Sequence, residues 1–284
     1  MSRARIAFLL PVTAALIAAG CGSDDSDDST TTASAENCTP DQLETLEAEK
    51  LTVATDDPAF PPYFEDNDPT NGKGFESATA FAIAEQLGYD EADVEWVVEP
   101  FNSSYAPGPK DFDFDLNQIS ITPKRAEQVD FSSPYYEAEQ AVVAIEGSDF
   151  ADATSLADFA DATIGVQIGT TSLEAVEAEI APSEDPQVFD TSNDVVTALE
   201  QDQVDAIVVD VPTAYFLTAV QVKDGVIVGQ FPAPGGDEWG ALLEKDSPLT
   251  ACVSQAIDDL NESGELPELE KQWMSEVTDT PVLE

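Results

Sequence analysis

Short apolar runs rich in β-branched residues alternate with stretches in which apolar positions recur every three or four residues. The short runs predict buried strands, and the longer stretches predict helices. The predicted strands are Leu51–Thr55, Val94–Val98, Phe114–Ile119, Ala141–Ile145, Thr163–Gln167 and Ala206–Val209. The predicted helices are Glu76–Leu87, Thr171–Ile180, Asn193–Glu200, Ser247 to about Asn261, and Leu266–Trp273. This alternation predicts an α/β protein with largely parallel sheets.

A further helix start lies at Thr122-Pro123, where a capping hydroxyl precedes a proline suited to the first turn. Arg125 then falls in the first turn, beside unpaired backbone N–H groups and the positive end of the helix dipole. A planar guanidinium in such a place suits a carboxylate, which it can hold through two hydrogen bonds. The alternative is a surface arginine paired with Glu127 or Asp130.

The N-terminus has the pattern of an export signal. Arg3 and Arg5 precede the apolar run Ile6–Ala19, which is too short to span a bilayer as a helix. The run ends at Ala18-Ala19-Gly20-Cys21, which resembles a lipoprotein cleavage site with Cys21 as the lipidated residue. We expect a signal peptide over 1–20 and a flexible, lipid-anchored tether over 21–37. The alternative is an ordinary secretory signal whose cysteine is incidental.

The chain is strongly acidic, with 58 Asp and Glu against 10 Lys and Arg, a formal charge of −48 and no histidine. Nucleic acid is excluded as a partner, because no basic surface is available to neutralise phosphates. The acids are spread along the chain among ordinary apolar periodicity, which indicates a solvated surface. Without histidine, a nucleophilic triad has no support. We expect neither a metal nor a cofactor.

Six segments, in this order, resemble one known family: Leu51–Tyr63, Gly74–Gly88, Ser120–Ser132, Ile164–Ser172, Val204–Tyr215 and Trp239–Trp273. They are similar to the family 3 extracellular solute-binding proteins, the amino-acid receptors of bacterial ABC importers. The resemblance implies a periplasmic-binding-protein type II-like fold, in which two α/β lobes are joined by a two-strand hinge. It places the first part of lobe 1 at 38–140, lobe 2 at 141–231, and the second hinge crossing with the return to lobe 1 at 232–284.

The resemblance also implies hinge crossings near Tyr136–Gln140 and Gln230–Glu238. It brings the C-terminal helices back to lobe 1, and so implies a disulfide between Cys38 and Cys252. Two unpaired small hydrophobic residues are the alternative. Phe101–Asp111 departs from the family, which has a helix there, because Pro107-Gly108-Pro109 opposes one.

The resemblance implies a site for a free amino acid. The ligand carboxylate would be bound by Arg125 and by the backbone of Gly169, Thr170 and Thr171. These three residues stand at the start of a helix, where backbone N–H groups bind anions. Asp210, at the end of an apolar strand, would bind the ammonium group, with help from Ser120 and the backbone of Gln118. The structural alternatives are a plain turn with a threonine cap at Gly169–Thr171 and a helix N-cap at Asp210.

The side-chain end of the ligand would meet Asp56 and Phe60. Phe60 matches the family's aromatic lid, although a core phenylalanine is the competing interpretation, and Asp56 could pair with a basic or amide group. Gln118 departs from the family's small residue, and Ala78 replaces a family acid.

We therefore expect an extracytoplasmic receptor, anchored by lipid to the outer face of the cell membrane. It would act as a monomer, binding a free amino acid with a polar or charged side chain and delivering it to ABC permease subunits. Two alternatives on the same fold are an enzyme, such as a periplasmic cyclohexadienyl or arogenate dehydratase, and a ligand-binding module of a sensor.

Overall fold

The computed structural model describes residues 38–274 and 280–284. The expected signal peptide over 1–20, the tether over 21–37 and the lipidation site at Cys21 lie outside the described residues. Among the helices of the described part, none is long and apolar enough to cross a membrane.

The first lobe is built on a five-stranded sheet with the order β2-β1-β3-β10-β4. Its strands are β1 (Leu51–Thr55), β2 (Val94–Val98), β3 (Phe114–Asp115), β4 (Asp130–Glu137) and β10 (Glu238–Leu243). β1 pairs in parallel with β2 and β3, whereas β10 runs antiparallel to β3 and β4. Every residue of β1 is buried, as its uninterrupted apolar run predicts.

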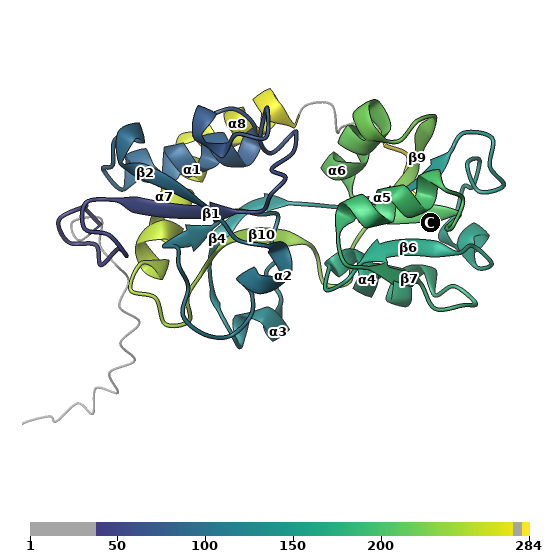
Figure 1. The fold of residues 1–284 in the computed structure, drawn as a ribbon, viewed down its shortest axis with the longest axis horizontal. Coiled ribbons are helices and arrows are strands. Elements are labelled where there is room, and N and C mark those ends of the chain that lie inside the picture. Colours follow the sequence, from purple (N-terminus) through teal and green to yellow (C-terminus); the bar gives the residue numbers. More distant parts are fainter. Residues whose placement is uncertain (1–37, 275–279) are drawn as a thin grey trace, which may run out of the picture. The chain divides into compact units, whose positions relative to one another are not determined.

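Helices α1 (Phe75–Gln86), α7 (Thr250–Ser263) and α8 (Glu265–Trp273) pack against one another in the first lobe (Figure 1). The lobe also contains α2 (Phe101–Ser104), α3 (Pro123–Ala126) and the 3₁₀ turns Pro69–Asn71 and Glu91–Asp93. A disulfide joins Cys38 to Cys252 of α7, with their Cα atoms 5.5 Å apart. The C-terminal helices are thus covalently tied to the start of the first lobe.

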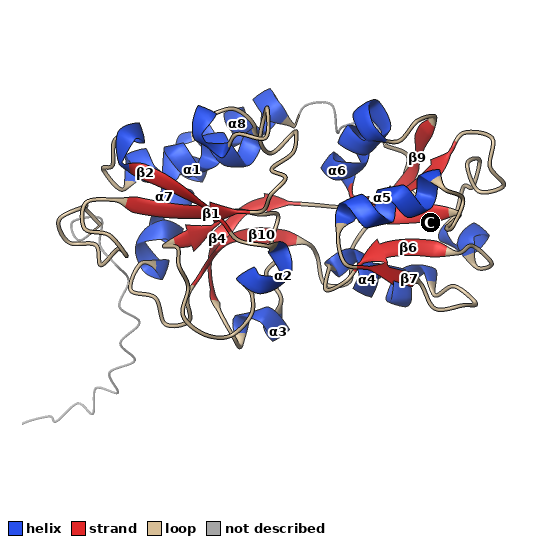
Figure 2. Ribbon diagram, viewed as in Figure 1, coloured by secondary structure: helices blue, strands red, loops and turns tan. Residues whose placement is uncertain are grey.

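The second lobe is built on a five-stranded sheet with the order β7-β6-β8-β5-β9. Figure 2 labels β6, β7 and β9 of this sheet. Its strands are β5 (Gln140–Ile145), β6 (Ile164–Gln167), β7 (Gln187–Phe189), β8 (Ala206–Asp210) and β9 (Gly225–Phe231). Its helices are α4 (Thr171–Ala175), α5 (Ser192–Glu200) and α6 (Val211–Phe216), with a 3₁₀ turn at Leu156–Phe159 and π-helical turns at Val176–Ile180 and Leu217–Gln221. Separate apolar clusters, one around Phe159 and one around Ile207, form its core.

Two segments carry the chain between the sheets. The first lies between β4 and β5, and the second runs from the end of β9 to β10. They touch directly, because the backbone N–H of Ala138 donates to the carbonyl of Asp237 at 2.8 Å. We call these the crossing segments. The fold is therefore a two-lobe α/β architecture of the periplasmic-binding-protein type.

The C-terminal end departs from the expected return to the first lobe. Met274, after α8, is buried in the core of the first lobe, whereas Leu283 is buried in the second. The backbone N–H of Leu283 donates to Gln230 of β9 at 2.9 Å, and Val282 forms a parallel bridge with the same residue. The chain thus reaches the second lobe a second time, because Leu283, an apolar residue near the C-terminus, is buried in that core.

Three other elements differ from expectation. β3 ends at Asp115 rather than Ile119, because Gln118 has a left-handed backbone (φ 49°) that a strand cannot contain. Thr171–Ile180 is α-helical only to Ala175 and continues as a π-helical turn. One helical turn does form at Phe101–Ser104, because it ends before Pro107.

Candidate functional site

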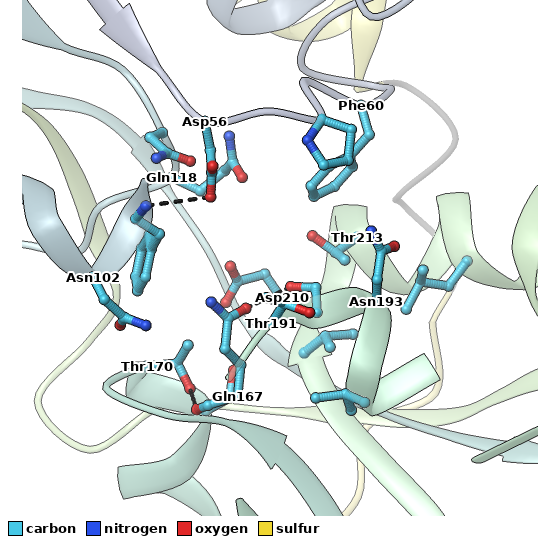
Figure 3. Close-up of a pocket in the computed structure, with 18 of the residues that line it drawn as sticks. Asp56, Phe60, Asn102, Gln118, Gln167, Thr170, Thr191, Asn193, Asp210 and Thr213 are labelled. Atoms are coloured by element: carbon cyan, nitrogen blue, oxygen red, sulfur yellow. Dashed lines mark hydrogen bonds between the residues drawn. The ribbon is translucent and has the colours of Figure 1, made fainter. Parts of the chain in front are cut away.

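Residues of both lobes line a cavity of about 470 Å³ (Figure 3). The first lobe contributes residues that include Asp56, Phe60, Asn102, Gln118, Ser120 and Arg125. The second contributes residues that include Gln167, Thr170, Thr171, Asn193, Asp210 and Thr213. Asp56 follows β1, Gln167 ends β6 and Asp210 ends β8, so the cavity lies at the carboxyl ends of parallel strands, where α/β folds bind ligands.

Arg125 lies in α3, whose N-cap Thr122 accepts a hydrogen bond from the Arg125 backbone at 3.2 Å. Its side chain is only 7% exposed. Nη1 donates to the carbonyl of Ser120 at 2.6 Å, and Nη2 donates to the carbonyl of Gly169 in the other lobe at 2.9 Å. The Tyr105 ring lies under the guanidinium, 4.8 Å from its carbon. The surface pairing with Glu127 or Asp130 is thus not the arrangement found.

Burial lowers the pKa of Arg125, but the pKa of a free arginine is so high that the guanidinium stays charged. The group therefore places a fixed positive charge at the cavity wall. A carboxylate can take the remaining donors of the guanidinium without moving its backbone partners.

The loop between β6 and α4 faces Arg125 from the second lobe. Gly169 has a positive φ of 75°, and a Cβ there would lie 2.3 Å from the Tyr105 hydroxyl, so only glycine allows this approach. Thr170 is the N-cap of α4 and accepts from the backbone of Leu173 at 3.2 Å. Thr171 lies at 3.2 Å from Ser120, hydroxyl to hydroxyl, across the two lobes.

Asp210 ends β8 and precedes α6, but its carboxylate makes no cap hydrogen bond to that helix. Instead Oδ1 accepts from Nε2 of Gln140 at 2.6 Å. Burial raises the pKa of Asp210 well above its usual value, and the nearby charge of Asp237 raises it further. The charge of Arg125 lowers the pKa of Asp210, so the two groups are close enough to interact electrostatically.

Asp237 is a polar residue of this region that the sequence patterns did not reveal. It lies in the second crossing segment and is 1% exposed. Oδ2 accepts from Nε2 of Gln140 at 2.7 Å and from the hydroxyl of Thr171 at 3.0 Å. Burial raises the pKa of Asp237, whereas hydrogen bonds from Ser120, Thr171 and Gln140 lower it.

Gln118 lines the cavity, but its amide is tied back into the first lobe. Its backbone N–H donates to Oε1 of Glu76 at 2.8 Å, and its Nε2 donates to Oε2 of the same carboxyl group. Glu76 also accepts from the Tyr135 hydroxyl at 2.5 Å. Burial raises the pKa of Glu76 to about 7, against these hydrogen bonds. The departure at Gln118 from a small residue therefore comes with a buried partner for the long amide.

Asp56 and Phe60 lie on the loop after β1. Asp56 accepts from the backbone of Asp57 at 2.7 Å and from the backbone of Phe101 at 3.2 Å (Figure 3). Phe60 is half-buried and stacks on Phe216 of α6, with 5.6 Å between the ring centres. It is therefore neither a fully buried core residue nor a free surface one, because it packs against the opposite lobe.

The family model for bacterial extracellular solute-binding proteins, family 3, matches residues 51–276. The chain belongs to this family. The arginine-binding extracellular protein of Bacillus subtilis is 31% identical over 219 residues, which cover 75% of this chain and 82% of that protein. The glutamine-binding protein of an ABC transporter of the same organism is 27% identical, over 73% of this chain and 76% of its own.

Solved structures give the same result for the fold. An ancestral arginine-binding protein bound to glutamine superposes with a TM-score of 0.66 at 28% identity, covering 80% of this chain and 98% of that one. An ancestral amino-acid-binding protein described as a precursor of cyclohexadienyl dehydratase gives a TM-score of 0.65 at 26% identity, covering 79% and 95%. These relatives are named as amino-acid-binding proteins, and the two solved structures share the fold seen here.

Several cavity residues carry no signal that sequence reasoning used. Thr213 is one, and its hydroxyl lies 2.9 Å from that of Tyr63 across the lobes. Asn193, at the start of α5, is another, and Asn102 of α2 is a third. Polar residues of loops and first helical turns are common, so only their position in the fold distinguishes them. Within the described ranges, no group of three or more His, Cys, Asp or Glu residues is arranged to hold a metal ion.

Proposed function

We propose that this chain is a receptor that captures a free amino acid in the cavity and delivers it to an ABC permease. The observation that carries the proposal is the placement of Arg125 and Asp210, one from each lobe, on the walls of one cavity. A free amino acid presents a carboxylate and an ammonium group on one carbon. Burial of either charge without a partner would be too costly for binding.

In this proposal the carboxylate is held by Arg125 and by the backbone of Gly169, Thr170 and Thr171. The carbonyl of Gly169 accepts from Arg125 in this structure, so the loop and the guanidinium lie side by side when the lobes meet. The ammonium group is held by Asp210 and the hydroxyl of Ser120. Ser120 is 4% exposed, and its hydroxyl lies 3.2 Å from that of Thr171. An ammonium group at this place could donate hydrogen bonds to both hydroxyl oxygens.

We also propose that the ligand has a cationic or amide side chain. Asp56 and Asp57 line the cavity, and Phe60 offers an aromatic face for the aliphatic part of the ligand side chain. A ligand cation would be attracted by these carboxylates and by the ring. The relatives named for arginine and glutamine are consistent with this class.

Ligand binding would bring or hold the two lobes together about the crossing segments. Contacts between the lobes at Tyr63–Thr213 and Phe60–Phe216 lie at the cavity and would stabilise the closed form. Small-angle scattering with and without saturating ligand measures this directly. Compaction is the expected result, and an unchanged radius of gyration would exclude closure.

The experiment that tests the receptor is calorimetric titration of the exported protein with each of the twenty standard L-amino acids. We expect tight binding of arginine or another polar member, and recovery of the ligand chemically unchanged. Conversion of the ligand to a product would favour the enzyme alternative instead. A lipid on Cys21 would keep the receptor at the outer face of the membrane, and Cys21→Ser should release it into the medium.

A further inference from the structure

The strongest unexplained feature of the cavity region is a pair of acids that share one amide. Nε2 of Gln140 donates to Oδ1 of Asp210 at 2.6 Å and to Oδ2 of Asp237 at 2.7 Å. Gln140 is fully buried, at the start of β5. One side-chain amide thus uses both of its hydrogens on two carboxyl groups, which are held near each other at the junction of the crossing segments.

Besides Gln140, the hydroxyl groups of Thr171 and Ser120 bond to Asp237 of this pair. Within the part of the chain that the structure describes, Oδ1 of Asp237 is buried without a hydrogen-bond partner. The charged groups that act on the pair are Arg125, Glu76 and Glu139, and the phenols that face it are Tyr63 and Tyr136. Arg125 is the single cation in this set, and its guanidinium is directed at the carbonyls of Ser120 and Gly169.

Two carboxylates in such surroundings cannot both stay ionised at low cost. Like charges held close together, and burial, both favour one retained proton. The two groups then titrate as one unit rather than as separate residues. An arriving cation changes this balance, because its charge replaces that of the proton.

We propose that Asp210 and Asp237 hold a proton between them until the ligand binds, and that the α-ammonium group of the ligand displaces it, so that amino-acid capture releases a proton. This inference rests on the proposed function of the cavity. In the step, the O–H bond of the protonated carboxyl group breaks and its proton goes to the solvent. The ammonium keeps its three protons and pairs with the carboxylate that remains. Asp237 acts through Asp210 and is a positioning residue.

The linkage has a definite sign. The ligand lowers the pKa of the pair, so the affinity for the ligand rises with pH. The rise begins near pH 4, about the ordinary pKa of a carboxyl group, and ends at the raised pKa of the ligand-free pair. The slope is at most about tenfold per pH unit for one proton released. Above the raised pKa, affinity no longer depends on this pair.

The test is calorimetric titration of the full-length exported protein between about pH 5 and pH 8, in buffers of different ionisation enthalpy, which gives the number of protons released. The probe is L-arginine, or whichever of the twenty standard L-amino acids binds most tightly. Binding of none of them would overturn the proposed function, and this inference with it. Binding without proton release anywhere in this range would overturn the inference alone.

Three variants separate coupling from a purely structural role. Asp237→Asn keeps the shape and removes the charge, so it should release fewer protons and flatten the dependence of affinity on pH. Asp152→Asn changes an exposed acid outside the cavity lining, and should release as many protons as the unaltered protein. Gln140→Met removes the donor that Asp210 and Asp237 share, so the pair should hold its proton to a higher pH. The pH range in which ligand binding releases the proton should then shift upward.

An Asp237→Asn variant that binds the ligand with the unaltered proton number would show that Asp237 is not part of the pair. If that variant does not fold, the shift of proton release in Gln140→Met decides the question. No shift there would likewise contradict the proposal.

Discussion

At the scale of single residues, the first lobe contains an acid in an unusual place. Asp115 of β3 is fully buried, and its carboxyl group bonds to the hydroxyl of Ser104, while its other oxygen has no partner within the described residues. Burial, with a smaller contribution from the nearby charge of Glu76, raises the pKa of Asp115 to about 8. A carboxyl group with this pKa is mostly neutral below pH 8 and ionises only at a cost to the fold.

The pH dependence of stability follows from this shift. The folded state binds a proton at Asp115 more strongly than the unfolded state does. Protonated Asp115 therefore gives its full contribution to the free energy of unfolding below about pH 4. This contribution is lost as pH rises from about 4 to about 8. The loss is about 1.4 kcal/mol for each unit by which the pKa of Asp115 in the folded state exceeds its pKa in the unfolded state.

We therefore predict that Asp115→Asn gains stability relative to the unaltered protein as pH rises through this window. Denaturant unfolding at several pH values measures the difference. Asp111→Asn, an exposed change of the same kind nearby, should show no such trend. A constant difference between Asp115→Asn and the unaltered protein at all pH values would contradict the buried carboxyl.

The candidate site could be predicted only in part. The residues carried by a motif, such as Arg125 and Asp210, line the cavity. Asp237 could not be found, because a chain with 58 acidic residues gives no reason to select one of them. The pairing of Gln118 with Glu76 could not be found either, since it joins residues 42 positions apart.

At the scale of elements, strands such as β1, with an uninterrupted apolar run, could be predicted, whereas β4 and β9 could not. β1 has the same bounds as its prediction, Leu51–Thr55. β4 contains Pro134, and β9 contains Gly225 and Gly229, so neither has a clear strand pattern. Their partners stabilise them instead: β4 is held by β10, and β9 by β5.

The loop between β6 and α4 gives a prediction at this scale. Gly169→Ala would place a methyl group 2.3 Å from the Tyr105 hydroxyl and 3.1 Å from Oδ1 of Asn102. We expect weaker ligand binding, because the two lobes can no longer approach at this point. The positive φ adds about 1–2 kcal/mol of backbone strain.

A double-mutant cycle separates the two causes. Tyr105→Phe removes the hydroxyl group, so the double variant Gly169→Ala with Tyr105→Phe should recover part of the lost affinity and leave the backbone strain and the close contact with Asn102. Calorimetric titration with the amino acid that binds gives the four values needed. Strict additivity of the two changes would show that the lobes do not meet here.

At the scale of the whole molecule, the C-terminal end forms a third connection between the lobes. Five residue positions separate Met274, in the core of the first lobe, from Thr280, whose hydroxyl donates to that of Tyr215 at 3.0 Å. A chain of this length spans at most about 20 Å. The end at Leu283 therefore limits how far the lobes can part at this edge.

We predict that Leu283→Asp lowers stability by about 2–3 kcal/mol, because a buried leucine is replaced by a charge. Leu283 is 4% exposed, whereas its neighbour Val282 is 62% exposed. Val282→Asp is therefore the matched control and should have almost no effect. Thermal unfolding compares the two, and equal melting temperatures would show that the end does not pack as described.

The most direct test of the central claim is to titrate the ligand amino acid into four variants of the exported protein. Arg125→Ala removes the cation of the carboxylate, and Asp210→Asn removes the counter-charge of the ammonium. Each should cost about 2–5 kcal/mol, or roughly 30- to several-thousand-fold in affinity. The matched controls Lys124→Ala and Asp152→Asn change exposed residues of the same charge and should bind normally. Near-native affinity in both site variants, or equal binding of the decarboxylated ligand, would contradict the clamp.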